Sequence, residues 1–201
     1  MAPVARSPYL TSGDLARLLS VDLKTVHNWV TRGHLTGWRT RGRHLRFRRT
    51  ELLRFMRRFG YPIPATLGEV PIEVVIVQAA NGKPPNLGVH INPHHAPSLA
   101  AAALELASGE YEALVIDLDR YTAAIIDELV TALRSRDATR GVAVVGLARD
   151  ENVQARFLRR GGLASVVTGD TRGLVAVLRY LVGGGPPPSN KVRLNEPNEP
   201  E

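Results

Sequence analysis

Hydrophobic residues follow two different patterns along this chain, one typical of short helices and one of buried strands. Between residues 9 and 59, apolar positions recur every three or four residues, as on one face of a helix. Between residues 72 and 182, short β-branched runs alternate with helix-like segments, which indicates strands covered on both faces. The patterns therefore predict two domains of different architecture, and 201 residues are enough for both.

The first domain is predicted to open with two short helices joined by a tight turn. Thr11 or Ser12 is suited to cap the first helix. Asp22 is suited to cap a second helix over about 23–31, and Gly33 ends that helix in a left-handed conformation. Such a pair of helices forms a helix-turn-helix. The apolar stripe of the second helix consists of Leu23, Val26, Trp29 and Val30.

A basic β-hairpin is predicted directly after the second helix. Two short strand-like runs flank the segment 41–43, which reads Arg-Gly-Arg. Alternation along the second run places Leu45 and Phe47 inward. The same alternation turns Arg46 and Arg48 outward, so the hairpin carries a positively charged tip and face.

A third helix follows, and composition then sets the limits of the domains. Thr50 is suited to cap a helix from 51 to about 58, whose arginines lie opposite its apolar side. The predicted organisation is a disordered N-terminus at 1–8, a first domain at 9–59, a Pro- and Gly-rich linker at 60–71, a second domain at 72–182 and a disordered tail at 183–201.

Charge is distributed unevenly between the two domains. Residues 1–60 hold thirteen Arg and Lys against three Asp and Glu, whereas residues 61–201 hold thirteen basic and sixteen acidic residues. Such an asymmetry favours a first domain that binds a polyanion. A basic face that merely keeps the domain soluble is the alternative.

Two absences narrow the function classes. Cysteine does not occur, which excludes disulfide frameworks, thiolate zinc sites and cysteine nucleophiles. No apolar run approaches the roughly 20 residues that span a bilayer, and no signal-peptide segment begins the chain. We therefore expect a cytoplasmic, nucleoid-associated protein without a membrane partner.

The first domain resembles the MerR-type winged helix of the small excisionase and BldC-like branch, over YLTSGDLARLLSVDLKTVHNWVTRGHLTGWRTRGRHLRFRRTELLRFM. Two positions depart from the family pattern, because Asp14 replaces the usual Glu and Arg43 replaces the second Gly of the wing. The resemblance implies binding to specific double-stranded DNA. The matching positions are Leu10, Thr11, Ala16, Leu19, Val21, Thr25, Val26, Trp29, Gly33, Leu35, Arg39, Gly42, His44 and Phe47.

Candidate DNA-binding residues follow from this resemblance and from side-chain chemistry. A helix in the major groove meets the base edges, where Asn pairs with adenine and Arg with guanine. This assigns base contacts to Thr25, Asn28 and Arg32 and a phosphate contact to Lys24. The resemblance places the hairpin, as a wing, in or along the minor groove, which attracts arginine. The full set is Lys24, Thr25, His27, Asn28, Arg32, Arg39, Arg41, Arg43, His44 and Arg46.

The second domain is predicted to be α/β, with a parallel sheet in the flavodoxin-like, doubly wound arrangement. Strands alternate with helices along the whole segment. The expected strands are 72–78, 113–118, 142–148 and 163–168, and the expected helices are 97–108, 122–135, 151–160 and 171–182.

This domain also resembles the receiver domain of two-component response regulators. Asp117 ends the segment ALVIDL, where a receiver carries its phosphoacceptor. The other groups that a receiver uses are absent. Residues 78–81 stand where a receiver has its acidic pair, Leu147 stands where it has a Ser or Thr, and Thr168 stands where it has a Lys. Phosphoryl transfer needs a metal ion and cations to neutralise developing charge, so we expect a degenerate receiver that works without phosphorylation.

The segment 82–98 is interpreted as a long loop. It places His90, His94 and His95 close together, but no carboxylate or cysteine partners lie nearby in the sequence, which favours solvated histidines over a metal site. No nucleotide-binding motif, nucleophile–base set or metal-ligand spacing occurs either. We therefore expect neither a cofactor nor enzymatic activity.

These features together predict a bacterial transcriptional regulator that binds DNA as a homodimer. Pairing two heads raises affinity, since one head contacts only a few base pairs. The second domain is the expected dimerisation or partner-binding part, with a candidate face at Leu174, Val175, Leu178 and Leu181. Two alternatives stay open: an excisionase-like, architectural DNA-binding protein, and a response regulator phosphorylated on Asp117.

Overall fold

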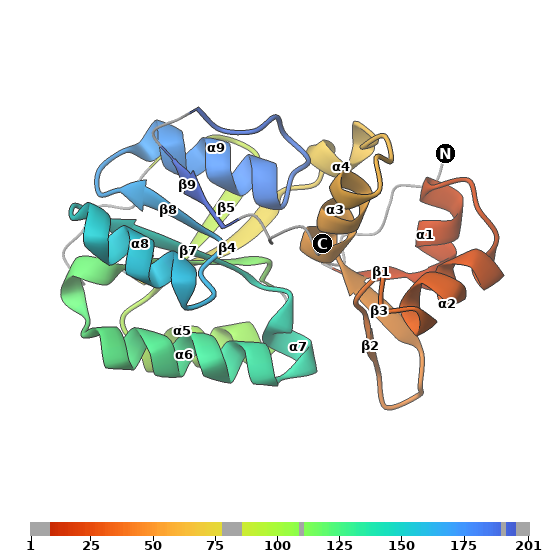
Figure 1. The fold of residues 1–201 in the computed structure, drawn as a ribbon, viewed down its shortest axis with the longest axis horizontal. Helices are drawn as coiled ribbons and strands as arrows, with labels where there is room; N and C mark the ends of the chain where they lie inside the picture. Colours follow the sequence, from red (N-terminus) through yellow and green to blue (C-terminus); the bar gives the residue numbers. More distant parts are fainter. Residues whose placement is uncertain (1–8, 78–85, 109–110, 190–191, 196–201) are drawn as a thin grey trace.

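Residues 9–77, 86–108, 111–189 and 192–195 are described by the computed structural model, in which a small head joins a larger α/β body (Figure 1). The head combines three helices with a three-stranded antiparallel sheet in the order β1-β3-β2. Its elements are β1 (Tyr9–Thr11), α1 (Ser12–Leu18), α2 (Leu23–Thr31), β2 (Trp38–Arg39), β3 (Leu45–Arg48) and α3 (Arg49–Arg58).

Local capping fixes the helix-turn-helix as the sequence predicts. Thr11 caps α1 through a reciprocal pair, in which the Asp14 N–H donates to Thr11 Oγ1 at 3.1 Å and the Thr11 N–H donates to Asp14 Oδ2 at 2.8 Å. Asp22 caps α2 by accepting from the Thr25 N–H at 2.7 Å. Gly33 follows α2 with a φ of +71°, so the left-handed turn there is confirmed.

Three local expectations for the head are wrong. Strand β1 was not expected, because three residues without clear alternation give no strand signal; it pairs with β3. Thr50 does not cap α3, which begins at Arg49 after an N-cap at Arg48 that makes no side-chain cap bond. Leu23 lies on the first turn of α2 and remains 51% exposed, so the core side of that helix begins at Val26.

The body is built on a six-stranded sheet in the order β5-β4-β6-β7-β8-β9. Its first five strands are parallel, and their order is that of the flavodoxin-like fold, which confirms the predicted class. The elements are β4 (Ile72–Val77), β5 (Ile91–Ala96), α5 (Leu99–Ser108), β6 (Ala113–Asp117), the 3-10 helix η1 (Leu118–Arg120), α6 (Ala123–Ser135), α7 (Asp137–Arg140), β7 (Ala143–Ala148), α8 (Glu151–Arg159), β8 (Ala164–Val167), α9 (Thr171–Leu181) and β9 (Arg193–Leu194).

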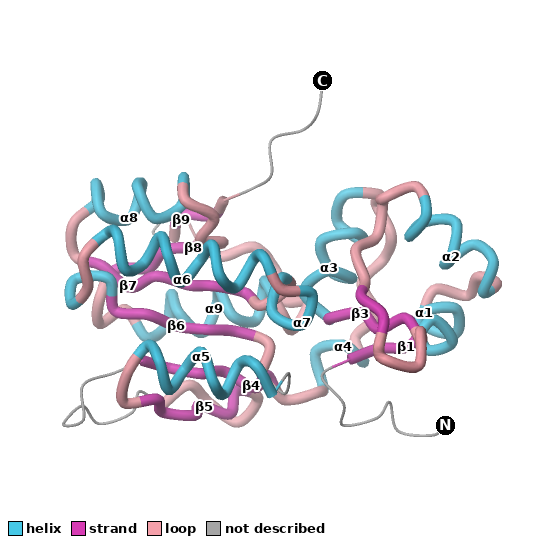
Figure 2. Tube along the Cα trace, turned by 90° about the horizontal axis from the view of Figure 1, so that it is seen from below, coloured by secondary structure: helices cyan, strands magenta, loops and turns pink. Residues whose placement is uncertain are grey.

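Helices cover both faces of this sheet, which explains why its strands are continuously apolar. Val74 and Ile76 of β4 face the core under α9, whereas Val75 and Val77 face the core under α5, α6 and α8. Figure 2 shows α5, α6 and α8 on the near side of the sheet, with α9 behind it.

The interpretation of residues 82–98 as one loop is wrong, because β5 occupies Ile91–Ala96 at the edge of the sheet. Its sequence, INPHHA, lacks the apolar alternation that marks a strand. Asn92, His94 and His95 are exposed there, and polar residues and proline are typical of edge strands.

The segments outside the two predicted domains also carry structure. Residues 60–71 contain a short helix, α4 (Thr66–Glu69), and Leu67 is buried in the head core, so this segment is not merely a linker. The prediction of a disordered tail is wrong for 192–195, where β9 pairs antiparallel with β8. The predicted disorder at 1–8 and at 196–201 lies outside the described residues.

Arg49 joins the head to the body. Its side chain is buried and forms an ion pair with Glu112, with 2.6 Å between Nε and Oε1 and a second contact between Nη2 and Oε2. Its remaining donors reach the backbone oxygens of Leu67, Val70 and Pro71 at 2.9–3.2 Å. All five guanidinium N–H groups are therefore used, which is the condition for burying this charge.

Two further arginines reach across the same boundary, although their positions predicted exposure. Arg48 is 1% exposed and donates to the backbone oxygen of Tyr111 at 2.6 Å. Arg57 donates to the backbone oxygen of Tyr180, and its guanidinium lies 3.9 Å from the centre of the Tyr180 ring. A Cβ at Gly141 would lie 2.7 Å from Arg48 Cδ, so glycine lets the body approach this closely. The expectation that Arg48 points outward is wrong because the body covers that face of the head.

We predict that Glu112→Ala strongly destabilises the chain. Burial raises the pKa of Glu112, and the bonds and charge of Arg49 are the largest influence that offsets it, with a smaller one from the charge of Arg48. Removing one partner of a buried pair costs about 3–5 kcal/mol because the other charge is left unpaired. Urea unfolding followed by tryptophan fluorescence measures the loss, since both tryptophans lie in the head.

Glu73→Ala is the matched control. Glu73 pairs with His94 at 3.0 Å in a partly exposed contact, which is worth less than about 1 kcal/mol. Equal effects of the two substitutions would contradict the role assigned to the Arg49–Glu112 pair.

Candidate nucleic-acid interface

Helix α2 presents a polar face to solvent. Lys24, His27, Asn28 and Arg32 are exposed, and Thr25 beside them is half-buried. These five predicted residues therefore share one side of a helix, as contact with a major groove requires.

The N-terminus of α2 is capped by its own chain, so a side chain and not the helix end would contact a phosphate. The Thr25 N–H is bonded to the Asp22 carboxylate, and hydrogen bonds from Thr25 lower the pKa of Asp22. That carboxylate occupies the end of the helix where an anion would otherwise bind. Lys24, exposed in the first turn, is then the group suited to a phosphate.

The opposite side of α2 is fixed to the head core. Val26 is fully buried, and the Trp29 ring lies 4.8 Å from the Phe55 ring and 5.6 Å from the Tyr61 ring. Trp29 is therefore a packing residue, as expected. The rigid backing sets the direction in which Asn28 and Arg32 point.

The hairpin forms a wing with a basic tip. Arg39, Arg41, Arg43 and His44 are exposed, whereas Arg46 is half-buried and donates to the backbone oxygen of Leu45. The wing is closed by the Thr40 N–H donating to the His44 oxygen at 3.0 Å, and Arg39 Nη1 donates to the Arg43 oxygen at 2.9 Å. Four of the five predicted wing residues are thus exposed, and one of these, Arg39, is bonded within the wing.

Arg43 adopts a left-handed backbone, with a φ of +60°. This conformation is costly for a residue with a Cβ and favours glycine. It is also the position where the winged-helix pattern has a second Gly. The chain therefore places a cation at the wing tip at some cost in backbone strain.

Asp117, to which the receiver resemblance assigns the phosphoacceptor role, lies at the end of β6 away from the head. Asp117 ends β6 half-buried, and its Oδ1 accepts from the Asp119 N–H at 3.2 Å. Asp119 in turn accepts from the Arg149 N–H at 3.2 Å, and Thr168 Oγ1 lies 3.5 Å from it. Residues 78–81, which stand where receivers have an acidic pair, fall outside the described ranges. Across those ranges, no group of three or more His, Asp and Glu is arranged to hold a metal ion.

Two of the four residues of the candidate dimerisation face are not accessible to a partner. Leu174 and Leu178 of α9 are 3% and 0% exposed, because they pack against the sheet within one chain. Val175 and Leu181 are half-buried against the same core. The apolar stripe of α9 thus serves the fold of the body.

The three histidines do not form a cluster around a ligand. His94 lies on β5 with its Nε2 3.0 Å from Glu73 Oε2, and its ring meets the edge of Tyr111 at 4.8 Å. His90 precedes the strand, and His95 faces the opposite side of it, both exposed.

Comparison with known proteins supports a helix-turn-helix in the head. A family model described as a helix-turn-helix domain matches residues 9–59, about a quarter of the chain. The model does not specify the MerR-type branch. No curated protein matches the chain. Among the described residues, no helix is both long and apolar enough to cross a membrane.

A solved structure resembles the body weakly. It is the signal receiver domain of a DNA-binding response regulator protein (merR) from Colwellia psychrerythraea 34H, at 16% identity and a TM-score of 0.42. The match covers 55% of this chain and 98% of that one. This likeness is too weak to carry an argument, so the fold is assigned from the strand order.

We predict opposite effects on stability for two substitutions at the wing tip. Arg43→Gly removes the left-handed strain and is expected to raise the stability of the head by about 1 kcal/mol. Arg41→Gly also removes one positive charge but relieves no strain, and it is expected to lower the stability of the head by about 0.5 kcal/mol. Thermal unfolding of both variants measures the difference, and a lower melting temperature for Arg43→Gly would refute the strain.

Proposed function

We propose that this protein is a sequence-specific DNA-binding transcriptional regulator of bacterial origin, with a head of the MerR type. One observation carries the proposal: the exposed face of α2 and the basic wing belong to one rigid domain that matches helix-turn-helix domains. Asn28 and Arg32 supply base recognition in the major groove. The wing arginines Arg41 and Arg43 supply contacts to the neighbouring minor groove.

The body, in this proposal, acts without phosphorylation. It holds the head in one orientation through Arg49 and serves as the part through which two copies or a protein partner associate. The face for that association lies elsewhere than on the α9 stripe, which the fold of the body uses. Sedimentation of the full chain with and without a specific duplex measures self-association, and a monomer in both conditions would refute the association of two copies.

We predict that Asn28→Ala and Arg32→Ala, each made separately, reduce discrimination between specific and random duplexes. A lost base contact costs about 1–3 kcal/mol of discrimination. A selection from random duplexes with the wild-type chain supplies the specific sequence, and fluorescence anisotropy measures both affinities. Arg172→Ala, an exposed arginine on α9, is the matched control and should leave the ratio unchanged. Unaltered discrimination in both α2 variants would refute α2 as the recognition helix.

We also predict that acetyl phosphate does not produce a stable phosphoprotein. Leu147 and Thr168 stand where a receiver has a hydroxyl residue and a lysine, so nothing at these positions stabilises a phosphoryl group on Asp117. Electrophoresis on a phosphate-affinity gel checks this outcome. A retarded band that disappears in Asp117→Asn would support phosphorylation instead.

A further inference from the structure

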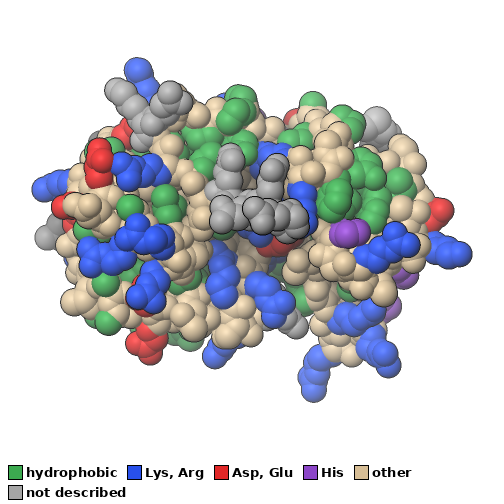
Figure 3. Space-filling model, viewed as in Figure 1, with side chains coloured by type: hydrophobic (Ala, Val, Ile, Leu, Met, Phe, Trp, Pro, Cys, Tyr) green, Lys and Arg blue, Asp and Glu red, His purple; other side chains and the backbone are tan. Residues whose placement is uncertain are grey.

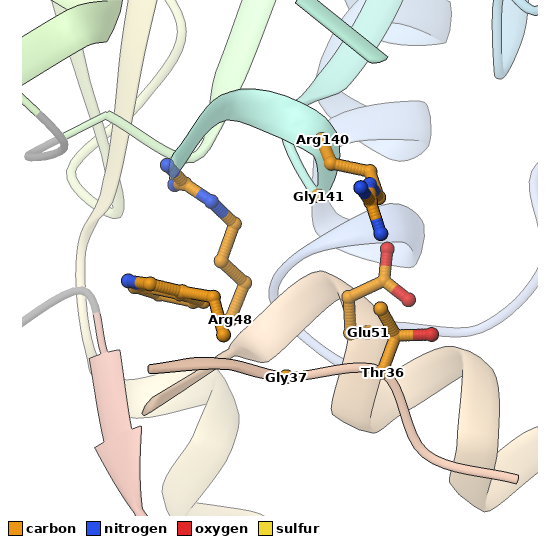
Figure 4. A pocket seen from close by; sticks show the side chains of 7 residues that line it. Thr36, Gly37, Arg48, Glu51, Arg140 and Gly141 are labelled. Carbon is orange, nitrogen blue, oxygen red and sulfur yellow. The ribbon is translucent and has the colours of Figure 1, made fainter. Parts of the chain in front are cut away.

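Basic side chains lie on both sides of the boundary between the head and the body. At the base of the wing, Thr36 and Gly37 meet Arg140 and Gly141 of the body, with Glu51 of α3 between them (Figure 4). The hollow they line is about 10 Å³, which holds at most one water molecule. A ligand of any size would therefore meet the side chains around this hollow and not enter it.

Four arginines lie on the elements that meet at this boundary, and we call them the arginine corner: Arg54 of α3, Arg134 of α6, Arg136 at the N-cap of α7, and Arg140 of α7. Arg134 is the innermost, donating to the backbone oxygens of Arg140 and Val142 at 2.5 and 2.9 Å. It thereby ties the end of α6 to the start of β7.

The four arginines of the corner outnumber the acidic residues near them in the sequence, Glu51 and Asp137. Burial, together with the charge of Arg54 across the boundary, lowers the pKa of Arg134 to about 10, while Glu51 acts in the opposite direction. Glu51 is itself bonded to Arg54 at 3.1 Å. Like charges from the head and the body thus face each other, which costs free energy until an anion offsets them.

The outer members of the corner are accessible. Arg136 and Arg140 are exposed, and the Arg54 side chain is 40% exposed. Figure 3 shows Lys and Arg side chains on the head, at the wing and at the junction of head and body, with other residues between these groups. Both parts therefore carry basic side chains on this face of the molecule.

We propose that the arginine corner binds backbone phosphates of the same duplex that the head contacts, beyond the wing. The inference rests on the proposed DNA-binding function and extends the contact surface onto the body. A duplex carries a negative charge about every 1.7 Å along its axis, so it matches a row of cations better than a compact anion does. These phosphates add affinity without adding sequence preference.

This arrangement gives the rigid junction a further purpose. The Arg49–Glu112 pair and the Arg57–Tyr180 contact hold Arg54 and α7 at a fixed distance from the wing. A fixed spacing lets the corner meet one rigid duplex together with the head, without first ordering a flexible linker.

The test measures the salt dependence of binding for Arg136→Ala/Arg140→Ala in the full chain. A fluorescent duplex of about 30 base pairs, roughly three helical turns, carries either the selected site or a scrambled one. Losing two phosphate contacts should make the negative slope of log K against log salt less steep by about 1.8. Over a fourfold salt increase, the variant should therefore lose about tenfold less affinity than the wild type. The ratio of specific to scrambled affinity should stay at its wild-type value.

The matched control is Arg120→Ala/Arg172→Ala, which removes two exposed arginines at the opposite end of the sheet. Its slope should equal that of the wild type. Because Arg140 also donates to the backbone oxygen of Arg134, Arg136→Ala alone is measured as well. The slope of this variant should be less steep than that of the wild type by about 0.9. Arg136→Lys, which keeps the positive charge, should restore the wild-type slope.

A wild-type slope in both alanine variants would overturn the proposal and leave the corner to another acidic partner. Equal slope losses in the corner and control variants would also overturn it, since they would reflect net charge alone. Failure of the proposed function looks different, because wild-type protein would then bind selected and scrambled duplexes equally.

Discussion

The buried ion pair between Arg49 and Glu112 determines how the two parts of this protein are arranged. It joins the first residue of α3 to the residue that precedes β6, and the same guanidinium also holds the backbone of residues 67–71. A buried charge is stable only with every donor satisfied, so neither part can turn away without leaving one charge unpaired. The head is consequently held in one orientation by electrostatics, where a flexible linker would have left it free.

This constraint decides which surfaces of the head are available. Arg48 and Arg57 contact the body and are therefore not available to DNA, whereas one side of α2 and the wing tip remain exposed. Thirteen basic residues in the first sixty positions therefore do not form one uniform basic face. Some stabilise the junction, and the remainder form the surface that we assign to DNA.

How far the sequence predicted the molecule depended on the range of each interaction. Caps at Thr11 and Asp22 and the turn at Gly33 were predicted because their partners lie within three or four residues. Strand β5 was missed because an edge strand does not need apolar alternation. Arg49 and Glu112 are 63 residues apart, and nothing local distinguishes them from solvated charges. The packing of Leu174 and Leu178 within the body was not predicted, because an apolar stripe predicts burial without identifying the partner.

The position of the head also bears on how the body influences it. The head contacts the body at the start of β6, beside Tyr111 and Glu112, whereas Asp117 lies at the opposite end of that strand. A five-residue strand in the middle of a packed sheet transmits little movement, because its neighbours hold it on both sides. A signal carried along β6 would therefore have to displace the whole sheet, whereas α9 offers a second route through the contact between Tyr180 and Arg57. A partner that touched α7 or the base of the wing would act on the head directly.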